Sequence, residues 1–244
     1  MQPDGSIGHL SLDKVKHAVV PLPKGDKSPV DLITDLAWAG DRLVAAARCN
    51  EAFRSKIFST TGALEHGKTG QLFSAETYHV SHRKWETRAP MSVLIPFKED
   101  GKQYIVGAFS YTPVVKYPID DLQPGAKIKG ISMIELGSGN RPLDMFAYSK
   151  GGKASVLANT FRFHHSRKPF GPSPYWATRF DQDLLAGHEK VNKTAVHRLR
   201  PETKRIELIE AYHGVVQMDR LNNQTAIALR KAGEDFDLVP LPLP

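Results

Sequence analysis

Two histidines and a glutamate in the first half of the chain have side chains that can bind a metal ion. His79 and His82 are three residues apart, and Glu86 follows four residues later. Neutral imidazole and carboxylate groups are ligands for Zn, Cu and Fe. In a loop the two rings can converge, with His213 as a third ligand, whereas on a strand the odd spacing sends them to opposite faces. We therefore take these four residues as candidate ligands of a transition metal, with hydrogen-bonded loop histidines as the alternative.

Two arginines occupy matching places shortly before a proline. Arg88 lies in the sequence RAPM (88–91) and Arg141 in NRPL (140–143). A pair of guanidinium groups is well suited to bind an anionic ligand. In the alternative interpretation, each arginine holds its own loop by bonding backbone carbonyls or an acid such as Asp144.

Sequence motifs of several enzyme classes are absent from the chain. It contains no GxSxG or HExxH pattern and no EF-hand loop. No catalytic residue is predicted on this basis. The sequence leaves open whether the protein is an enzyme, and an oxidoreductase is the leading class if it is one.

Four segments of the chain share one plan, in which an apolar run, a polar turn and a second apolar run precede a short third run. The turns contain the Gly, Asn or Asp of tight hairpins. The runs are rich in Val, Ile, Ala and aromatic residues, which is typical of strands. The repeats lie near residues 31–60, 91–119, 141–170 and 212–241, and residues 62–90 and 171–201 are predicted to be long loops.

The repeats predict a single all-β domain over residues 1–244, built as a β-propeller with about four recognisable blades. An open β-sandwich is the alternative. Four blades form either a complete small ring or part of a larger ring of about six to eight blades. A part-ring exposes two sheet edges, which favours closure by a partner protein or a second chain. Residues 10–22 and 238–244 are candidate closing strands, although the prolines of the second segment would blunt an edge.

In a propeller, the loops that lead into the innermost strands gather at one mouth of the central channel. Ligand sites form where loops converge on a rigid scaffold. Polar residues from several repeats are expected at this mouth, where they could meet an anionic small ligand or a partner. The candidate ligand-binding residues are His79, His82, Arg88, Asn140, Arg141, Asp144 and His213.

The composition excludes several classes of protein. The 244 residues include 33 Lys and Arg and 26 Asp and Glu, giving a net charge of +7, and 41% are hydrophobic, which is too apolar for a disordered chain. The single Cys49 excludes a disulfide scaffold. No apolar stretch approaches the ~18 residues of a membrane-spanning helix. The basic residues are too dispersed for the continuous patch of a nucleic-acid-binding surface.

The segments ITDLAWAGDRLVAA (33–46) and GNRPLDM (139–145) resemble an inner blade hairpin and the loop leading into the next blade. The resemblance is to bacterial extracytoplasmic β-propeller proteins of the seven- or eight-bladed, quinoprotein-like or surface-repeat kind. It implies a periplasmic location, although the first twenty residues lack the apolar core of a secretion signal. We expect a binding or assembly module, and the alternative is a periplasmic redox enzyme or subunit with a metal or quinone cofactor at the mouth.

Overall fold

The computed structural model describes residues 8–9, 11–62, 64–111, 113–123, 126–137, 139–167, 171–188, 194–197 and 205–244. Within these ranges every regular element is a strand or a short 3-10 helix, so the prediction of an all-β chain is confirmed. The 3-10 helices are η1 (Val80–His82), η2 (Gln182–Leu185) and η3 (Glu210–Tyr212). The described part of the chain holds no helical segment with the length and hydropathy that crossing a bilayer requires.

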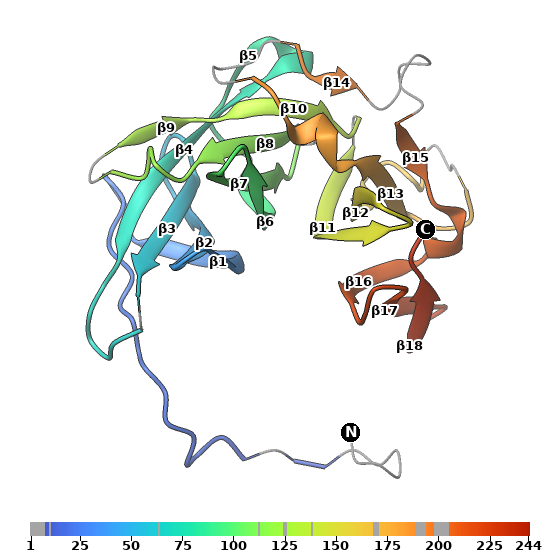
Figure 1. Cartoon of the computed structure of the whole chain (residues 1–244), viewed down its shortest axis with the longest axis horizontal. Coiled ribbons are helices and arrows are strands. Elements are labelled where there is room, and N and C mark those ends of the chain that lie inside the picture. Colours follow the sequence, from blue (N-terminus) through green and yellow to red (C-terminus); the bar gives the residue numbers. More distant parts are fainter. Residues whose placement is uncertain are drawn as a thin grey trace.

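The strands form four sheets, numbered here in chain order (Figure 1). Sheet 1 contains β1 (Val30–Ala39), β2 (Arg42–Cys49), β3 (Ser55–Thr61) and β4 (Gln71–His79), with β5 (Lys84–Glu86) and β9 (Lys127–Lys129) paired to β4. Sheet 2 contains β6 (Met91–Glu99), β7 (Lys102–Phe109), β8 (Pro113–Pro118), β10 (Ile131–Glu135) and β14 (Val196–His197). Sheet 3 contains β11 (Asn140–Lys150), β12 (Lys153–Arg162), β13 (Tyr175–Asp181) and β15 (Ile206–Leu208). Sheet 4 contains β16 (Val215–Arg220), β17 (Thr225–Ala232) and β18 (Asp235–Pro242).

Each predicted repeat supplies the first strands of its own sheet, but the third repeat differs in detail. The short third run of this repeat is residues 160–163, which the repeat pattern predicts as a separate strand, whereas β12 runs on without a break to Arg162. Asn159 stays within the strand because its side chain accepts the N–H of Asp144 (2.7 Å) and donates to the carbonyl of Val215 (3.0 Å). The third strand of sheet 3 is β13, and residues 168–170 of this repeat lie outside the described ranges.

The two predicted long loops also contain strands. Residues 62–90 include β4, η1 and β5, and residues 171–201 include β13, η2 and β14. In β4 the alternating residues Phe73, Ala75 and Thr77 are buried. A period of two marks a strand with a buried face, and this pattern was missed because polar residues surround it.

The four sheets follow one another along an arc, with their first strands on its inner side (Figure 1). Strand β1 contacts β6, β6 contacts β11, and β11 contacts β16. A hydrophobic core lies between each pair of successive sheets, so the middle sheets are apolar on both faces. The cores include Ile57, Phe73 and Ile105 between sheets 1 and 2, Val106, Val156 and Phe180 between sheets 2 and 3, and Leu157, Val215 and Ala228 between sheets 3 and 4.

The first hairpin of every sheet contains a β-bulge at the same level. The residue that follows the bulge is Asp35, Val93, Asp144 or Gln217. The carboxylate of Asp35 accepts the N–H of Leu94 on the next first strand (2.8 Å). Asp144 accepts the N–H of Met218 in the same way (2.9 Å). These repeated bonds set neighbouring first strands in one register.

Removing a large side chain from a core between two sheets tests whether these cores stabilise the fold. Phe180 is fully buried between sheets 2 and 3. We expect Phe180→Ala to lower the free energy of unfolding by about 3–5 kcal/mol, because it leaves a cavity that the two sheets cannot close. Urea unfolding followed by tryptophan fluorescence measures this loss. Tyr111→Ala, at an exposed turn, is the control and should cost less than about 0.5 kcal/mol; equal losses would contradict the assignment.

Candidate functional site

Several predicted site residues lie where the first strand of a sheet begins. Arg88 precedes β6, Asn140 and Arg141 open β11, and His213 precedes β16. We call these four residues the start surface. Asn140 is buried and its amide donates to the carbonyls of the preceding loop, so it shapes the loop. Arg88 and Arg141 are exposed, and His213 is half-buried.

His79 is buried between two glutamates at the outer part of sheets 1 and 2. Its Nε2 lies 3.2 Å from a carboxylate oxygen of Glu135, and its Nδ1 lies 4.0 Å from one of Glu86. Glu135 also accepts the N–H of Val80 (3.1 Å), and Glu86 accepts the N–H of Arg88 (2.6 Å). The histidine therefore joins the end of β4 to β10 and to the loop that leads into β6. This is a structural contact rather than an open ligand site.

The predicted metal ligands are not assembled into a metal site. His79 ends β4 and His82 lies in η1, where the turn of the chain brings their ring centroids to 4.1 Å. His213 instead packs on Trp176 in sheet 3, with ring centroids 6.3 Å apart. Among the described residues, no three His, Cys, Asp or Glu side chains are grouped to hold a metal ion. The fold separates His213 from His79 because the two belong to sheets at opposite ends of the arc.

The guanidinium of Arg141 packs against aromatic side chains of sheet 3. Its guanidinium carbon lies 5.6 Å from the ring centroids of both Phe161 and Phe163. Phe161 also lies 5.3 Å from the ring of Tyr175, its cross-strand neighbour. Contact with two ring faces holds the guanidinium by cation–π attraction. Among the described side chains no carboxylate pairs with Arg141, and Asp144 is instead bonded to Met218.

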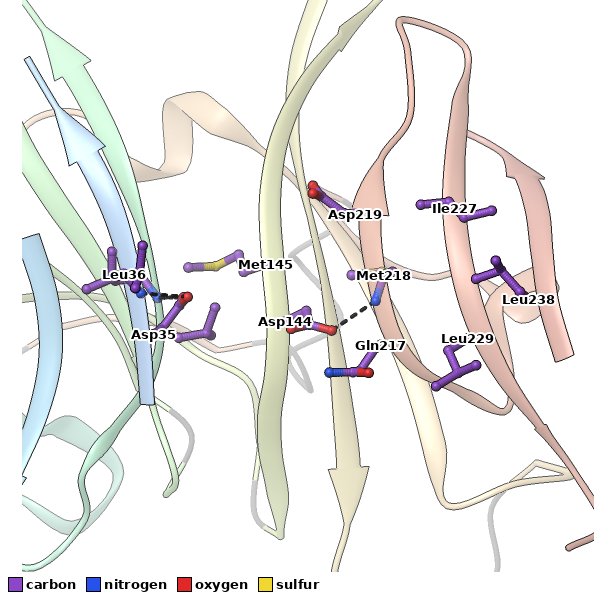
Figure 2. Close-up of a pocket in the computed structure, with 12 residues that line it drawn as sticks. Asp35, Leu36, Asp144, Met145, Gln217, Met218, Asp219, Ile227, Leu229 and Leu238 are labelled. Carbon is purple, nitrogen blue, oxygen red and sulfur yellow. Dashed lines mark hydrogen bonds between the residues drawn. The ribbon is translucent and has the colours of Figure 1, made fainter. Parts of the chain in front are cut away.

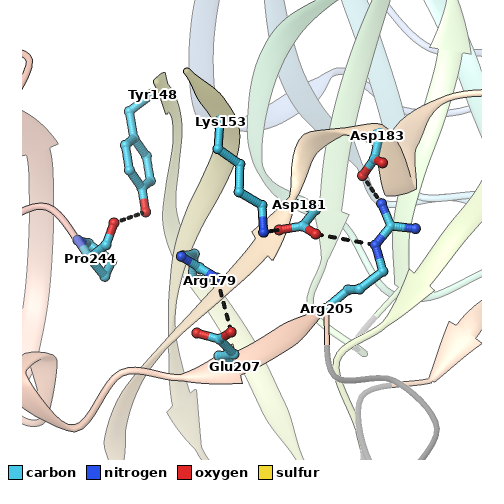
Figure 3. A network of polar contacts seen from close by, with 8 residues as sticks. All are labelled: Tyr148, Lys153, Arg179, Asp181, Asp183, Arg205, Glu207 and Pro244. Atoms are coloured by element: carbon cyan, nitrogen blue, oxygen red, sulfur yellow. Dashed lines mark hydrogen bonds and ion pairs between the residues drawn. The ribbon is translucent and has the colours of Figure 1, made fainter. Parts of the chain in front are cut away.

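Polar residues at the opposite end of sheet 3 pair with one another (Figure 3). The Asp181 carboxylate lies 2.8 Å from the ammonium group of Lys153 and 3.2 Å from the guanidinium of Arg205. Arg179 contacts Glu207 (3.0 Å). The hydroxyl of Tyr148 donates to the carbonyl of the last residue, Pro244 (2.8 Å). The charges of this end are satisfied within the chain, unlike that of Arg141.

Asp144 lies away from the start surface, in a cavity on the inner side of the arc (Figure 2). The cavity has a volume of about 550 Å³. It combines acidic or amide side chains with apolar ones from the first strands and from sheet 4. Its lining includes Asp35, Leu36, Asp144, Gln217, Asp219 and Leu238.

Two aspartates of the cavity have perturbed pKa values. Burial raises the pKa of Asp35 above its ordinary value, against the hydrogen bonds from the N–H groups of Leu94 and Leu36. Burial also raises the pKa of Asp144, against the bond from Met218, and the charges of Asp35 and Asp219 add to this increase. The cavity therefore disfavours a further negative charge.

The aromatic partners of Arg141 were not among the predicted site residues. Phe161 and Phe163 are two residues apart, so on a strand they lie on the same face. Their side of the sheet faces Arg141 because Arg141 is the cross-strand partner of Phe161. The spacing was a usable signal, but the strand register that supplies the arginine was not in the sequence.

No protein-family model matches the chain, and no curated protein matches it. Inference of its function therefore depends on the geometry of its own residues.

Asp181 and Asp144, two aspartates of sheet 3, should affect stability with opposite dependence on pH. Burial opposes ionisation of Asp181, but the bonds from Lys153 and Arg205 outweigh it and hold its pKa below the ordinary value. Its carboxylate stabilises the folded state above pH 4 and loses this effect as the pH falls through the lowered pKa. The raised pKa of Asp144 has the opposite sign: the folded state loses stability as the pH rises above about 4.

We expect Asp181→Asn to lower the free energy of unfolding at pH 7, with a loss that shrinks in acid. Asp144→Asn should raise it at pH 7, since the amide oxygen can still accept the Met218 N–H, with a gain that vanishes in acid. Urea unfolding between pH 3 and pH 7 measures both. Changes of the same sign at pH 7 would show that one of the two environments is wrongly assigned.

Proposed function

We propose that the four sheets are blades of a β-propeller and that the chain is a binding module whose start surface takes an anionic group. Several features support the blade assignment. The first three strands of each sheet pair antiparallel, and among the described residues parallel pairing is confined to β9 with β4 and β14 with β10. The first strands lie on the inner side of the arc, and successive sheets pack face to face. Radial repetition of such sheets is the plan of propellers.

The observation that carries the binding proposal is the state of Arg141. Its guanidinium is exposed, lies against Phe161 and Phe163, and has no acidic partner among the described residues. Aromatic contact restricts the side chain without neutralising its charge. A guanidinium held in this way presents its planar N–H donors to a carboxylate or phosphate, which it can bind in bidentate fashion.

Arg88 provides a second positive charge on the same surface. It precedes β6, and β6 contacts β11, the strand that carries Arg141. Its loop is fixed because Glu86 accepts the backbone N–H groups of Arg88 and Ala89 (2.6 and 3.0 Å). The Arg88 side chain is exposed and is thus left to meet a ligand. The net charge of +7 favours approach of an anion.

A redox enzyme with a metal or quinone cofactor was the competing prediction. The described residues provide no ligand set for a metal at the start surface, and no contact favours a quinone there. We therefore develop the binding module as the proposed function.

Removal of single arginine charges tests the proposal. Inorganic phosphate and a hexaglutamate peptide serve as probes of the two anion chemistries, and calorimetric titration measures their dissociation constants. We expect Arg141→Gln to weaken binding of the preferred probe by about tenfold or more, because a charge-assisted hydrogen bond is worth at least one decade. Arg88→Gln should weaken it by a smaller factor.

Arg220→Gln is the matched control, since Arg220 is an exposed arginine at the far end of β16. It should leave the dissociation constant unchanged. Absence of binding of both probes to the unaltered protein, or equal loss in the Arg141 and Arg220 variants, would refute an anion site at the start surface.

A further inference from the structure

Among the described residues, sheet 4 has three strands and lacks the fourth strand that each of the other sheets contains. Sheets 1, 2 and 3 each have a fourth strand in the described ranges, namely β4, β10 and β15. The chain passes from β10 to β11, and from β15 through η3 to β16, the first strands of the next sheets. From β4 it reaches β6 through η1 and β5. The third strand of sheet 4, β18, is the last strand that the structure describes.

By the same order, the residues before β1 occupy the place of a fourth strand that belongs to a preceding sheet. Residues 11–22, which we call the N-terminal arm, include no strand residue. The arm contacts the loop between β3 and β4, where the Val19 N–H donates to His66 and the carbonyl of Pro21 accepts from Thr69. Leu12, Val15 and Val19 are exposed, although apolar side chains of this size are usually buried in part.

The face of sheet 1 that points away from sheet 2 is exposed at a position that is buried in the other sheets. The second residue after the bulge is Leu36 in β1, Leu94 in β6, Met145 in β11 and Met218 in β16. Leu94, Met145 and Met218 are 3%, 6% and 7% exposed, since each packs against the preceding sheet. Leu36 is 59% exposed. This face is built like the others but has no preceding sheet.

Sheet 4 has a corresponding exposed residue on the face that points away from sheet 3. The third-strand residue at the level of the bulge is Ile57 in β3, Val114 in β8, Ala177 in β13 and Leu238 in β18. The first three are 0%, 0% and 1% exposed because a following sheet covers them. Leu238 is 58% exposed. Sheets 1 and 4 thus each present a face like those buried between the other sheets, but without a neighbouring sheet to cover it.

We propose that a second copy of this chain covers both ends, so that two copies close a ring of eight sheets. Sheet 1 of each copy packs on sheet 4 of the other, and its N-terminal arm adds the fourth strand beside β18. This inference rests on the proposal that the sheets are propeller blades.

A second copy is the favoured occupant because one chain carries both halves of the contact. The arm and the Leu36 face lie at one end, and the three-stranded sheet with the Leu238 face lies at the other. Two copies related by a two-fold axis make this contact twice and leave no end open. A ring of eight blades also falls within the usual range of about 4–8.

Prolines limit where the arm can pair. Pro240 and Pro242 have no N–H to offer on the edge of β18, so strand addition is confined to residues 235–239. A short pairing is sufficient in this fold, because β15 pairs with β13 over residues 178–180 alone.

Sedimentation velocity of the full chain without ligand measures the association. We expect a species of twice the 27.1 kDa mass of one chain. Leu36→Arg and Leu238→Arg should each weaken dimerisation by roughly 30-fold or more, the effect of losing a central interface residue. Val15→Asp should weaken it as well, and it removes no buried contact within one copy. Tyr111→Arg, which changes a 47% exposed residue at a turn of sheet 2, is the matched control and should remain a dimer.

Mixing the two arginine variants tests the head-to-tail geometry. Leu36→Arg keeps an intact sheet 4 face, and Leu238→Arg keeps an intact sheet 1 face and arm. The mixture should therefore regain a dimer through one unaltered interface. Failure to regain it would overturn the proposed contact.

Three further outcomes would overturn the proposal. They are a monomer of the unaltered chain, open assemblies larger than a dimer, and a dimer that neither arginine variant affects. A monomer whose terminal faces are covered only by a different protein would assign the occupant to that protein. Dimerisation is measured without phosphate or peptide, so its failure can be told apart from failure of the anion site.

Discussion

Burial of both faces of each sheet is the constraint on which the rest of the structure depends. A three- or four-stranded sheet that is apolar on both faces cannot be stable alone, because each exposed face leaves apolar area in water. Sheets 2 and 3 meet this condition with a neighbour on either side. Sheets 1 and 4 meet it on one side only, which explains the exposure of Leu36 and Leu238. Stacking of the sheets thus creates three cores and two unsatisfied ends.

The same stacking positions the polar residues. Asp35 and Asp144 follow the bulges of alternate sheets and bond the backbone of the next first strand. These bonds join β1 to β6 and β11 to β16, and β6 contacts β11. Arg88 lies just before β6, and Arg141 lies at the start of β11. At the other end of sheet 3, acids and bases neutralise one another. Arg141, at the start of sheet 3, has no such acidic partner among the described residues.

Local sequence patterns determined the strands and their grouping. Short apolar runs around Gly, Asn and Asp turns specify hairpins through local backbone geometry, and these runs coincide with the first strands of all four sheets. The sequence also singled out Arg141 by its place before a proline. It failed at β4, where polar neighbours hide the alternation of buried residues, and at β13, which is buried on both faces and has no alternation. It also failed at residues 160–163, where Asn159 interrupts the apolar pattern but bonds two other strands.

Tertiary structure decided which residues meet. Cross-strand register places Phe161 opposite Arg141, and sheet order separates His213 from His79, which instead lies between Glu86 and Glu135. Residue types and spacing along one chain state what chemistry is available. Contacts between residues far apart in sequence depend on how the sheets stack and pair, because those distances are set by burial over the whole molecule. For this protein, therefore, the sequence by itself determined the β-repeats and the charged residues between them, and only the stacked sheets decided which charges stay unpaired and which faces stay uncovered.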